Sequence, residues 1–241
     1  MNKIYLSCCF FIIHLSIYAQ HIIDKEGAIV RSDTSKKNIY LCFTGHDYAE
    51  GFNYVLTVLK KQKVKGSFFL TGDFVRNNKK LVKQIIKNGH FVGAHSDKHI
   101  LYCDWKKRDS LLYSEDLIKE DILQNLIVLK KQHIEPKYFM PPYEWYNKKV
   151  VEIAAQLNQK TINFSSGTRS NADYTTPDMP NYISSDDILK SIYNYVCLKN
   201  MNGFHLLIHP GTNPKRTDKF YFLLDELISK LKNEGYHFAK F

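Results

Sequence analysis

Short apolar runs alternate with longer amphipathic stretches from residue 38 to the end of the chain. The short runs are rich in β-branched and aromatic residues, and the longer stretches repeat apolar residues at i, i+3 and i+4. Strands are expected at 38–44, 66–71, 90–94, 137–140, 160–164, 203–209 and 236–241, and helices at 51–63, 78–88, 114–133, 148–158, 186–199 and 219–234. Steady βα alternation is typical of a parallel sheet, closed as a barrel or open and doubly wound. The sequence therefore predicts a single-domain α/β fold of about seven βα units.

The first nineteen residues have a different character from the rest of the chain. Lys3 supplies a positive charge, residues 4–17 form an apolar run, and Tyr18-Ala19 precedes Gln20. This order is typical of a secretory signal peptide, and the apolar run is shorter than the roughly 20 residues of a membrane span. We predict a signal peptide over 1–19, a domain over 20–241, and an exported protein without stable membrane insertion after cleavage. An uncleaved N-terminal anchor is the alternative.

The composition is that of a folded, basic protein. Hydrophobic residues make up 44% and aromatic residues 14%, which excludes a disordered chain. Lys and Arg number 34 against 24 acidic residues, a net charge of +10 that suits anionic partners such as wall polysaccharide or a membrane surface. Lysines that only keep the surface solvated are the alternative. The sequence contains neither a nucleic-acid module nor a G-x-G-x-x-G or P-loop motif, so we expect no nucleic-acid partner.

Histidines and carboxylates gather where the predicted strands stop. In a βα barrel these strand ends form the side on which catalysis takes place. His95 and His99 follow the third strand at a spacing of four, which one helical turn would bring to the same face. Two imidazoles and a carboxylate leave an open position on a zinc-like ion. With Asp47 as the carboxylate, the sequence predicts one divalent metal ion, with zinc expected.

Three segments together resemble a known family. Residues 93–99 (GAHSDKH) resemble the H-[ST]-x-x-H metal motif of the metal-dependent polysaccharide deacetylases, which include chitin and peptidoglycan deacetylases. Residues 141–143 (PPY) resemble the end of their R-x-P-Y motif, and residues 206–209 (LLIH) their L-x-x-H motif. The resemblance covers about residues 38–241. It implies a distorted (β/α) barrel with fewer than eight complete units, a mononuclear zinc-like centre, and hydrolysis of acetyl groups from an amino-sugar polysaccharide or oligosaccharide.

The chain departs from that family at two places. The family's T-F-D-D-G motif supplies a catalytic base and a metal ligand, whereas here Phe43 is followed by Thr-Gly-His-Asp. If two residues are inserted, Asp47 matches the metal ligand and His46 stands at the place of the base. Without an insertion, Thr44 and Gly45 occupy those places, and neither can perform either role. Met140 replaces the arginine that orients the base, and Glu144 is a second candidate for the missing base.

The remaining roles follow from the resemblance and from the loops. His209 is expected to protonate the leaving amine, and the backbone N–H of Tyr143 to hold the oxyanion. Tyr143 and Trp145 offer flat faces to a sugar ring. Arg169 and Asp173 lie in a Gly/Ser/Asn-rich loop that looks like a pocket wall, where they would orient a catalytic group or pin the loop.

The sequence leaves three functions open. The first is a metal-dependent hydrolase that removes N-acetyl or O-acetyl groups from an amino-sugar-containing glycan. The second is a non-catalytic carbohydrate-binding protein that kept the barrel but lost the usual base, as the missing aspartate and arginine suggest. The third is a metal-dependent hydrolase of another ester or amide. The retained histidine pair and His209 favour an enzyme.

Overall fold

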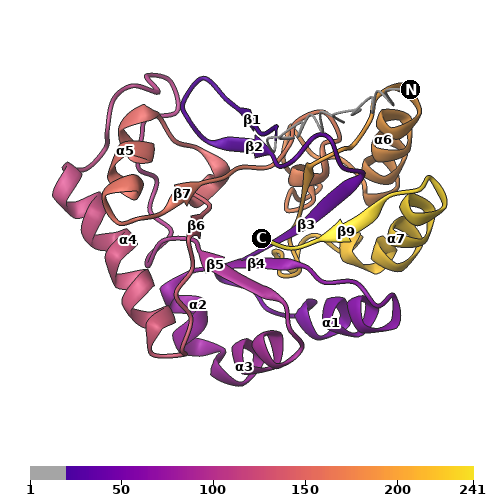
Figure 1. The fold of residues 1–241 in the computed structure, drawn as a ribbon, viewed down its shortest axis with the longest axis horizontal. Helices are drawn as coiled ribbons and strands as arrows, with labels where there is room; N and C mark the ends of the chain where they lie inside the picture. Colours follow the sequence, from indigo (N-terminus) through magenta and orange to yellow (C-terminus); the bar gives the residue numbers. More distant parts are fainter. Residues whose placement is uncertain (1–19) are drawn as a thin grey trace, which may run out of the picture.

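The computed structural model describes residues 20–241, and the predicted signal peptide lies outside these residues. Within this part of the chain a curled nine-stranded sheet is surrounded by seven α-helices, which confirms the predicted α/β barrel (Figure 1). The strands are β1 Ile22–Ile23, β2 Ile29–Arg31, β3 Asn38–Gly45, β4 Ser67–Leu70, β5 Phe91–Ala94, β6 Tyr138–Phe139, β7 Lys160–Thr161, β8 Phe204–Ile208 and β9 His237–Ala239. The helices are α1 Phe52–Lys61, α2 Gly72–Asn77, α3 Lys79–Lys87, α4 Glu115–Lys130, α5 Lys148–Gln156, α6 Ser185–Leu198 and α7 Leu224–Asn233.

The sheet runs in the order β1-β2-β8-β3-β4-β5-β6-β7, and β9 pairs with the first half of β3. From β8 to β7 all neighbours are parallel, as βα alternation requires. The hairpin β1–β2 brings the two ends of the sheet together. Arg31 pairs with Phe204 of β8, while Ile29 forms a bridge with Ile162, just after β7. These two- and three-residue strands are too short for a periodic pattern, and the sequence did not predict them.

Both faces of the central strands are buried, which explains their nearly continuous apolar sequences. The helix-facing side carries the large core, in which Phe68 stacks on Phe43 and packs at a tilt against Phe52. The inner side carries a smaller cluster of Cys42, Phe69, Met140, Ile162 and Leu207. The barrel interior is therefore packed with side chains and leaves room for a site only at its ends.

The predicted helices agree closely with those of the structure, and Gly89 is an example. It follows α3 at φ 75°, the left-handed C-cap conformation expected for a glycine in this position. The predicted helix 114–133 ends earlier, at Lys130, since His133 adopts φ 61° before Pro136. The short helix α2 was not predicted.

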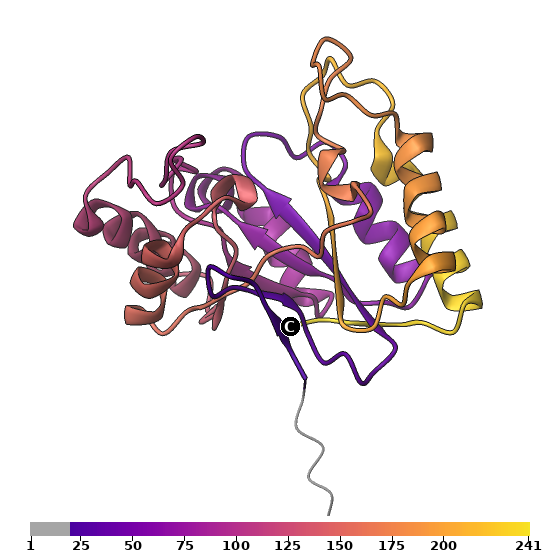
Figure 2. The ribbon, with the colours of Figure 1, turned by 90° about the horizontal axis from the view of Figure 1, so that it is seen from above.

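The two ends of the barrel differ. The loops that follow β7 and β8 rise at the end where the parallel strands point, and the C-terminus lies at the opposite end (Figure 2). We call the first end the mouth and the second the basal face. Among residues 20–241 no helix combines the length and the apolar character that crossing a membrane requires.

Candidate active site

A cavity of about 410 Å³ opens at the mouth, and we call it the mouth cavity. The loops after β3, β5, β6, β7 and β8 supply its walls, so segments far apart in the sequence meet there. Its lining residues are Thr44, His46, Asp47, Tyr48, His95, His99, Trp105, Tyr143, Glu144, Tyr174, His209 and Gly211. Seven of the ten residues predicted for the site are among them: His46, Asp47, His95, His99, Tyr143, Glu144 and His209.

The end of β3 carries the residues that the two possible alignments set against the family's two aspartates. Thr44 is buried and faces the cavity. A Cβ at Gly45 would lie 2.8 Å from Leu70 and 2.9 Å from Phe52, so this position faces the helix layer. Alternation along the strand returns His46 to the cavity, and Asp47 follows. The only carboxylate at this strand end is therefore that of Asp47, and Thr44 contributes a hydroxyl.

The segment that carries His95 and His99 is a loop, so the predicted helical turn is wrong. Ser96 at φ 71° and His99 at φ 54° are left-handed, and the Ser96 Oγ accepts a hydrogen bond from the His99 N–H at 2.9 Å. This local turn still brings the two rings together, with centroids 5.0 Å apart. Helix α4 supports the loop through two buried polar residues. Asn125 accepts from the His95 N–H at 2.9 Å, and Asp121 accepts from the Lys98 N–H at 2.9 Å.

The two imidazoles have the right chemistry for a metal. The His95 Nδ1–H donates to the carbonyl of Met140 at 2.7 Å, which leaves Nε2 as the free lone pair. Burial lowers the pKa of His95 to about 3 and also lowers that of His99, so both rings are neutral at pH 7. The Nδ1 of His99 is buried and has no hydrogen-bond partner among the described residues.

The third expected ligand does not complete this pair. The Asp47 side chain is 66% exposed, and its Oδ1 lies 3.2 Å from Nε2 of His46. His46 in turn stacks on His99 at 4.1 Å between centroids, and burial lowers its pKa. Lone pairs lie in the ring planes, so two stacked imidazoles do not both point at one ion. Among residues 20–241 no group of three or more His, Cys, Asp or Glu side chains is arranged to hold a metal ion. The donor pair fits a metal, whereas Asp47 would have to move.

The turn after β6 places a carboxyl group in the cavity. Tyr143 and Glu144 are consecutive left-handed residues, at φ 60° and 53°, within the 3-10 segment η1 (Pro142–Glu144). Such backbone persists where its surroundings fix it, and here Asn163 donates to the Glu144 carbonyl at 3.1 Å. Burial raises the pKa of Glu144 to about 7, while His209 lowers it and Asp173 raises it. A carboxyl group with that pKa can exchange protons at neutral pH.

His209 is held by the buried carboxylate of Asp173. Its Nδ1–H donates to Asp173 Oδ1 at 2.5 Å, and its backbone N–H donates to Oδ2 at 2.8 Å. Burial alone would lower the pKa of His209, but the charge and hydrogen bond of Asp173 raise it above its ordinary value. His209 is therefore a proton donor near neutral pH, and Asp173 acts through it without lining the cavity.

The loop that carries Asp173 is fixed by a residue that the sequence did not single out. The fully buried Arg216 donates to the carbonyls of Thr175 at 2.7 Å and Ile183 at 3.1 Å. Arg169, by contrast, is exposed and lies outside the cavity lining. In the sequence Arg216 sits in a polar Asn-Pro-Lys-Arg-Thr run, which looks like an ordinary exposed loop.

The aromatic rim includes three residues that sequence reasoning missed. Trp105, Tyr48 and Tyr174 line the cavity, whereas Trp145 does not. Trp145 packs instead on Trp105 at 5.3 Å between centroids and under the guanidinium of Arg108 at 4.2 Å. Trp105 lies in the long connection between β5 and α4, where only its aromatic character signals a role.

Comparison with known proteins identifies the family of the chain. Residues 31–162 match the family model described as polysaccharide deacetylase. The uncharacterized protein YlxY of Bacillus subtilis is 34% identical over 194 residues, which cover 80% of this chain and 51% of that protein. A peptidoglycan-N-acetylglucosamine deacetylase of Bacillus cereus is 28% identical over 185 residues, 77% of each chain. The chain thus spans about half the length of the first of these relatives.

Solved structures show the same barrel. A CE4 family pseudoenzyme from Bacillus anthracis superposes with a TM-score of 0.72 at 25% identity, covering 90% of this chain and 68% of that one. A mutant of the same pseudoenzyme is described as having restored enzymatic activity. The family match covers more than half of the chain and includes the strand ends that carry His46, His95, His99 and Glu144. The chain therefore belongs to the polysaccharide deacetylase family.

Proposed function

We propose that the mouth cavity removes acetyl groups from an amino sugar of an exported cell-wall polysaccharide, with peptidoglycan as the favoured substrate. The observation that carries this proposal is the convergence of a neutral imidazole pair, a carboxyl group with a pKa near 7 and the His209–Asp173 pair on one cavity. Relatives described as peptidoglycan deacetylases support the substrate class and an extracellular place of action.

Glu144 and His209 would act as the general base and the general acid. Glu144 would accept the proton of the attacking water, because its raised pKa lies in the range that suits a general base. His209, kept protonated by Asp173, would protonate the leaving amine. His46 is the alternative base, although its Nε2 contacts Asp47 and its ring stacks on His99.

We further propose that His95, His99 and Asp47 hold a zinc-like ion after the Asp47 carboxylate leaves His46. Such an ion supplies Lewis-acid polarisation of the acetyl carbonyl. The first turn of η1 has N–H groups without intrahelical acceptors, and that of Tyr143 would donate to the developing oxyanion. The exposed faces of Tyr143 and Trp105 offer stacking surfaces for the sugar.

Acetate release tests this proposal. Zinc- or cobalt-loaded protein and a chelated sample are incubated with N-acetylated oligosaccharides and peptidoglycan fragments. We expect metal-dependent acetate that is lost in His95→Ala, reduced about 100-fold or more in Glu144→Gln, and unchanged in His133→Ala, an exposed histidine far from the cavity. Loss in His46→Ala with retention in Glu144→Gln would instead make His46 the base.

A non-catalytic carbohydrate-binding protein is the second candidate. Thr44 faces the cavity where the ungapped family pattern has its base, and a pseudoenzyme of the same family has the same fold. This candidate predicts sugar binding without acetate release in the metal-loaded parent. It also predicts that binding survives His209→Ala.

A further inference from the structure

Lysines crowd the basal face, where the helices end and the parallel strands begin. Exposed lysines lie in the connections that lead into β3, β4, β6 and β8, and Lys87 ends α3 just before β5. The basal face also contains the chain after β9. Its lysines are Lys36, Lys37, Lys60, Lys61, Lys63, Lys65, Lys87, Lys130, Lys131, Lys137, Lys160, Lys199, Lys230, Lys232 and Lys240.

Acidic residues are scarce on this face. Asp33, Glu135 and Glu234 each pair with a nearby lysine, and Lys61 pairs with Asp225 of α7. The other lysines form no ion pair with the residues that the structure describes. The loops of the mouth, in contrast, mix acidic and basic residues in similar numbers. The molecule is therefore electrically polar, with its excess positive charge at the end opposite the cavity.

Compensation of helix dipoles does not account for this pattern. A lysine in the last turn stabilises a helix by offsetting the negative end of its dipole. Lys63, Lys65 and Lys137, however, lie beyond the helix ends, within the connections themselves. Lys79 and Lys83 lie in the first half of α3, where a positive charge gains nothing from the dipole. Helix capping therefore does not explain all of the lysines around this face.

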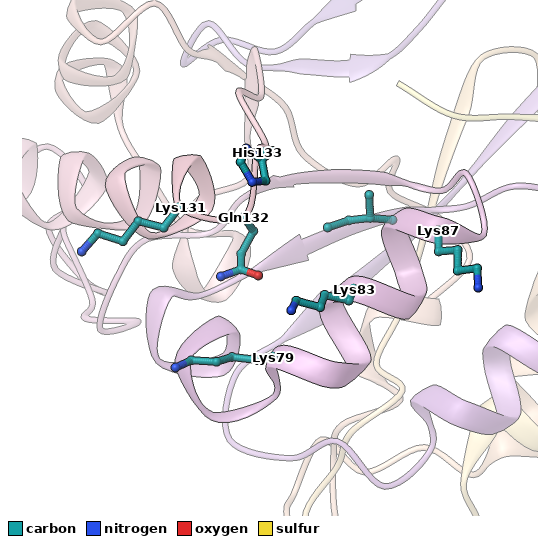
Figure 3. A pocket seen from close by; sticks show the side chains of 7 residues that line it. Lys79, Lys83, Lys87, Lys131, Gln132 and His133 are labelled. Carbon is teal, nitrogen blue, oxygen red and sulfur yellow. The ribbon is translucent and has the colours of Figure 1, made fainter.

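Two hollows adjoin this surface, and the first extends from it along α3 to Lys83 and Lys79. The first has a volume of about 480 Å³, and Figure 3 shows the lysines of α3 and the residues after α4 around it. It is lined by Lys79, Lys83, Ile86, Lys87, Lys131, Gln132 and His133. The second, of about 430 Å³, shares Lys87 and adds Lys60, Lys63 and Lys65. Hollows of this size and charge accommodate phosphate-bearing headgroups.

His90, which lines the second hollow, shows the effect of the positive charges around it. Burial, together with the positive charges of Lys65 and Lys240, lowers the pKa of His90 to about 4. The lysine ammonium groups therefore act together on this surface.

The start of the described chain lies on the same face. The carbonyl of Gln20 accepts hydrogen bonds from the backbone N–H of Thr34 at 3.0 Å and from its hydroxyl at 3.1 Å, just before β3. In the sequence, the apolar run 4–17 is separated from Gln20 by two residues, and in the alternative of an uncleaved anchor it would stay attached there. A membrane reached by that run would meet the basal face and not the mouth.

We propose that the basal face docks peripherally on an anionic phospholipid membrane and holds the mouth cavity away from it, toward the wall. Anionic headgroups would lie against the lysines of the two hollows, and attraction would weaken with salt. The inference does not depend on the proposed function, because none of these residues lines the mouth cavity.

Vesicle binding tests the proposal. Residues 20–241 contain the complete described sheet, helices and core, so binding through residues 1–19 plays no part in the assay. Partition is measured by co-sedimentation with phosphatidylcholine vesicles and with vesicles containing phosphatidylglycerol. We expect binding to the anionic vesicles alone, abolished in high salt. The triple variant Lys83→Gln, Lys87→Gln, Lys131→Gln should lower partition about 100-fold, since each lysine contributes about fivefold.

A matched variant separates position from net charge. Lys106→Gln, Lys107→Gln, Lys148→Gln removes the same charge from exposed, unpaired lysines of the mouth, and it should leave partition within about fivefold of the parent. Equal losses in the two triple variants would overturn the proposal, as would equal binding to neutral vesicles. Binding to soluble polyphosphate without binding to anionic vesicles would overturn it in favour of a polymer partner.

Discussion

The pairing of His209 with Asp173 fixes how the activity should depend on pH. Asp173 raises the pKa of His209, so the imidazole stays protonated to higher pH than a free histidine. As the proposed acid, His209 is active while protonated, and the rate falls as pH rises through its pKa. In Asp173→Asn the amide oxygen can still accept the Nδ1–H, but the negative charge is gone. We expect the alkaline limb of kcat to move about one unit or more to lower pH.

The comparison for that variant is Asp178→Asn, which changes an exposed aspartate of the same loop that pairs with Lys215. Its alkaline limb should coincide with that of the parent. An unchanged limb in Asp173→Asn would show that His209 does not act as the acid.

Glu144 should make the protein less stable as pH rises. Its pKa is about 7 in the folded protein against an ordinary 4.5, because burial penalises the charged form. Between these values the folded state binds more protons than the unfolded state, so stability is lost as pH rises. The full penalty is present above pH 7 and amounts to at most about 3 kcal/mol.

Glu144→Gln removes this penalty, so the variant should be more stable than the parent at pH 8. Near pH 4.5 the two should differ little. Urea unfolding at both pH values measures the difference. A difference that is the same at pH 4.5 and pH 8 would mean that ionisation of Glu144 carries no cost.

At the scale of elements, the loop between β7 and α6 depends on Arg216. Its guanidinium donates to two backbone carbonyls of this loop and to Ser185 Oγ at 3.0 Å. Arg216→Met would leave these acceptors buried without a partner, at a cost of about 3 kcal/mol. We expect the melting temperature to fall by roughly 6–12 °C and amide exchange over 170–185 to rise.

Lys215→Ala is the control for this change, since the neighbouring Lys215 is exposed and bonds only Asp178 across the same loop. It should alter neither the melting temperature nor the exchange of 170–185 by a comparable amount. If Arg216→Met leaves the exchange of this loop unchanged, other contacts hold Asp173 in place.

The same elements show what a sequence can and cannot reveal. The βα order followed from periodicity, and Gly89 marked the end of α3, because both signals are local. The histidines at the strand ends were found because polar residues break apolar runs. Trp105 and Arg216 were missed because their roles depend on how long loops fold back. The hairpin β1–β2 was missed because its strands close the barrel through partners more than 100 residues away.

At the scale of the whole molecule, a metal bound only by the folded barrel must raise its stability. With free zinc at 100 times the dissociation constant, the gain is about 2.7 kcal/mol, or roughly 5–10 °C in melting temperature for a chain of this size. This gain in melting temperature can be measured even if the protein has no enzymatic activity. It should disappear in His95→Ala and shrink in Asp47→Ala, because the Asp47 carboxylate must leave His46 to complete the site. His133→Ala, which removes an exposed histidine, should keep the full gain. An identical melting temperature with zinc and with chelator in the parent would show that the His95–His99 pair does not recruit a third ligand.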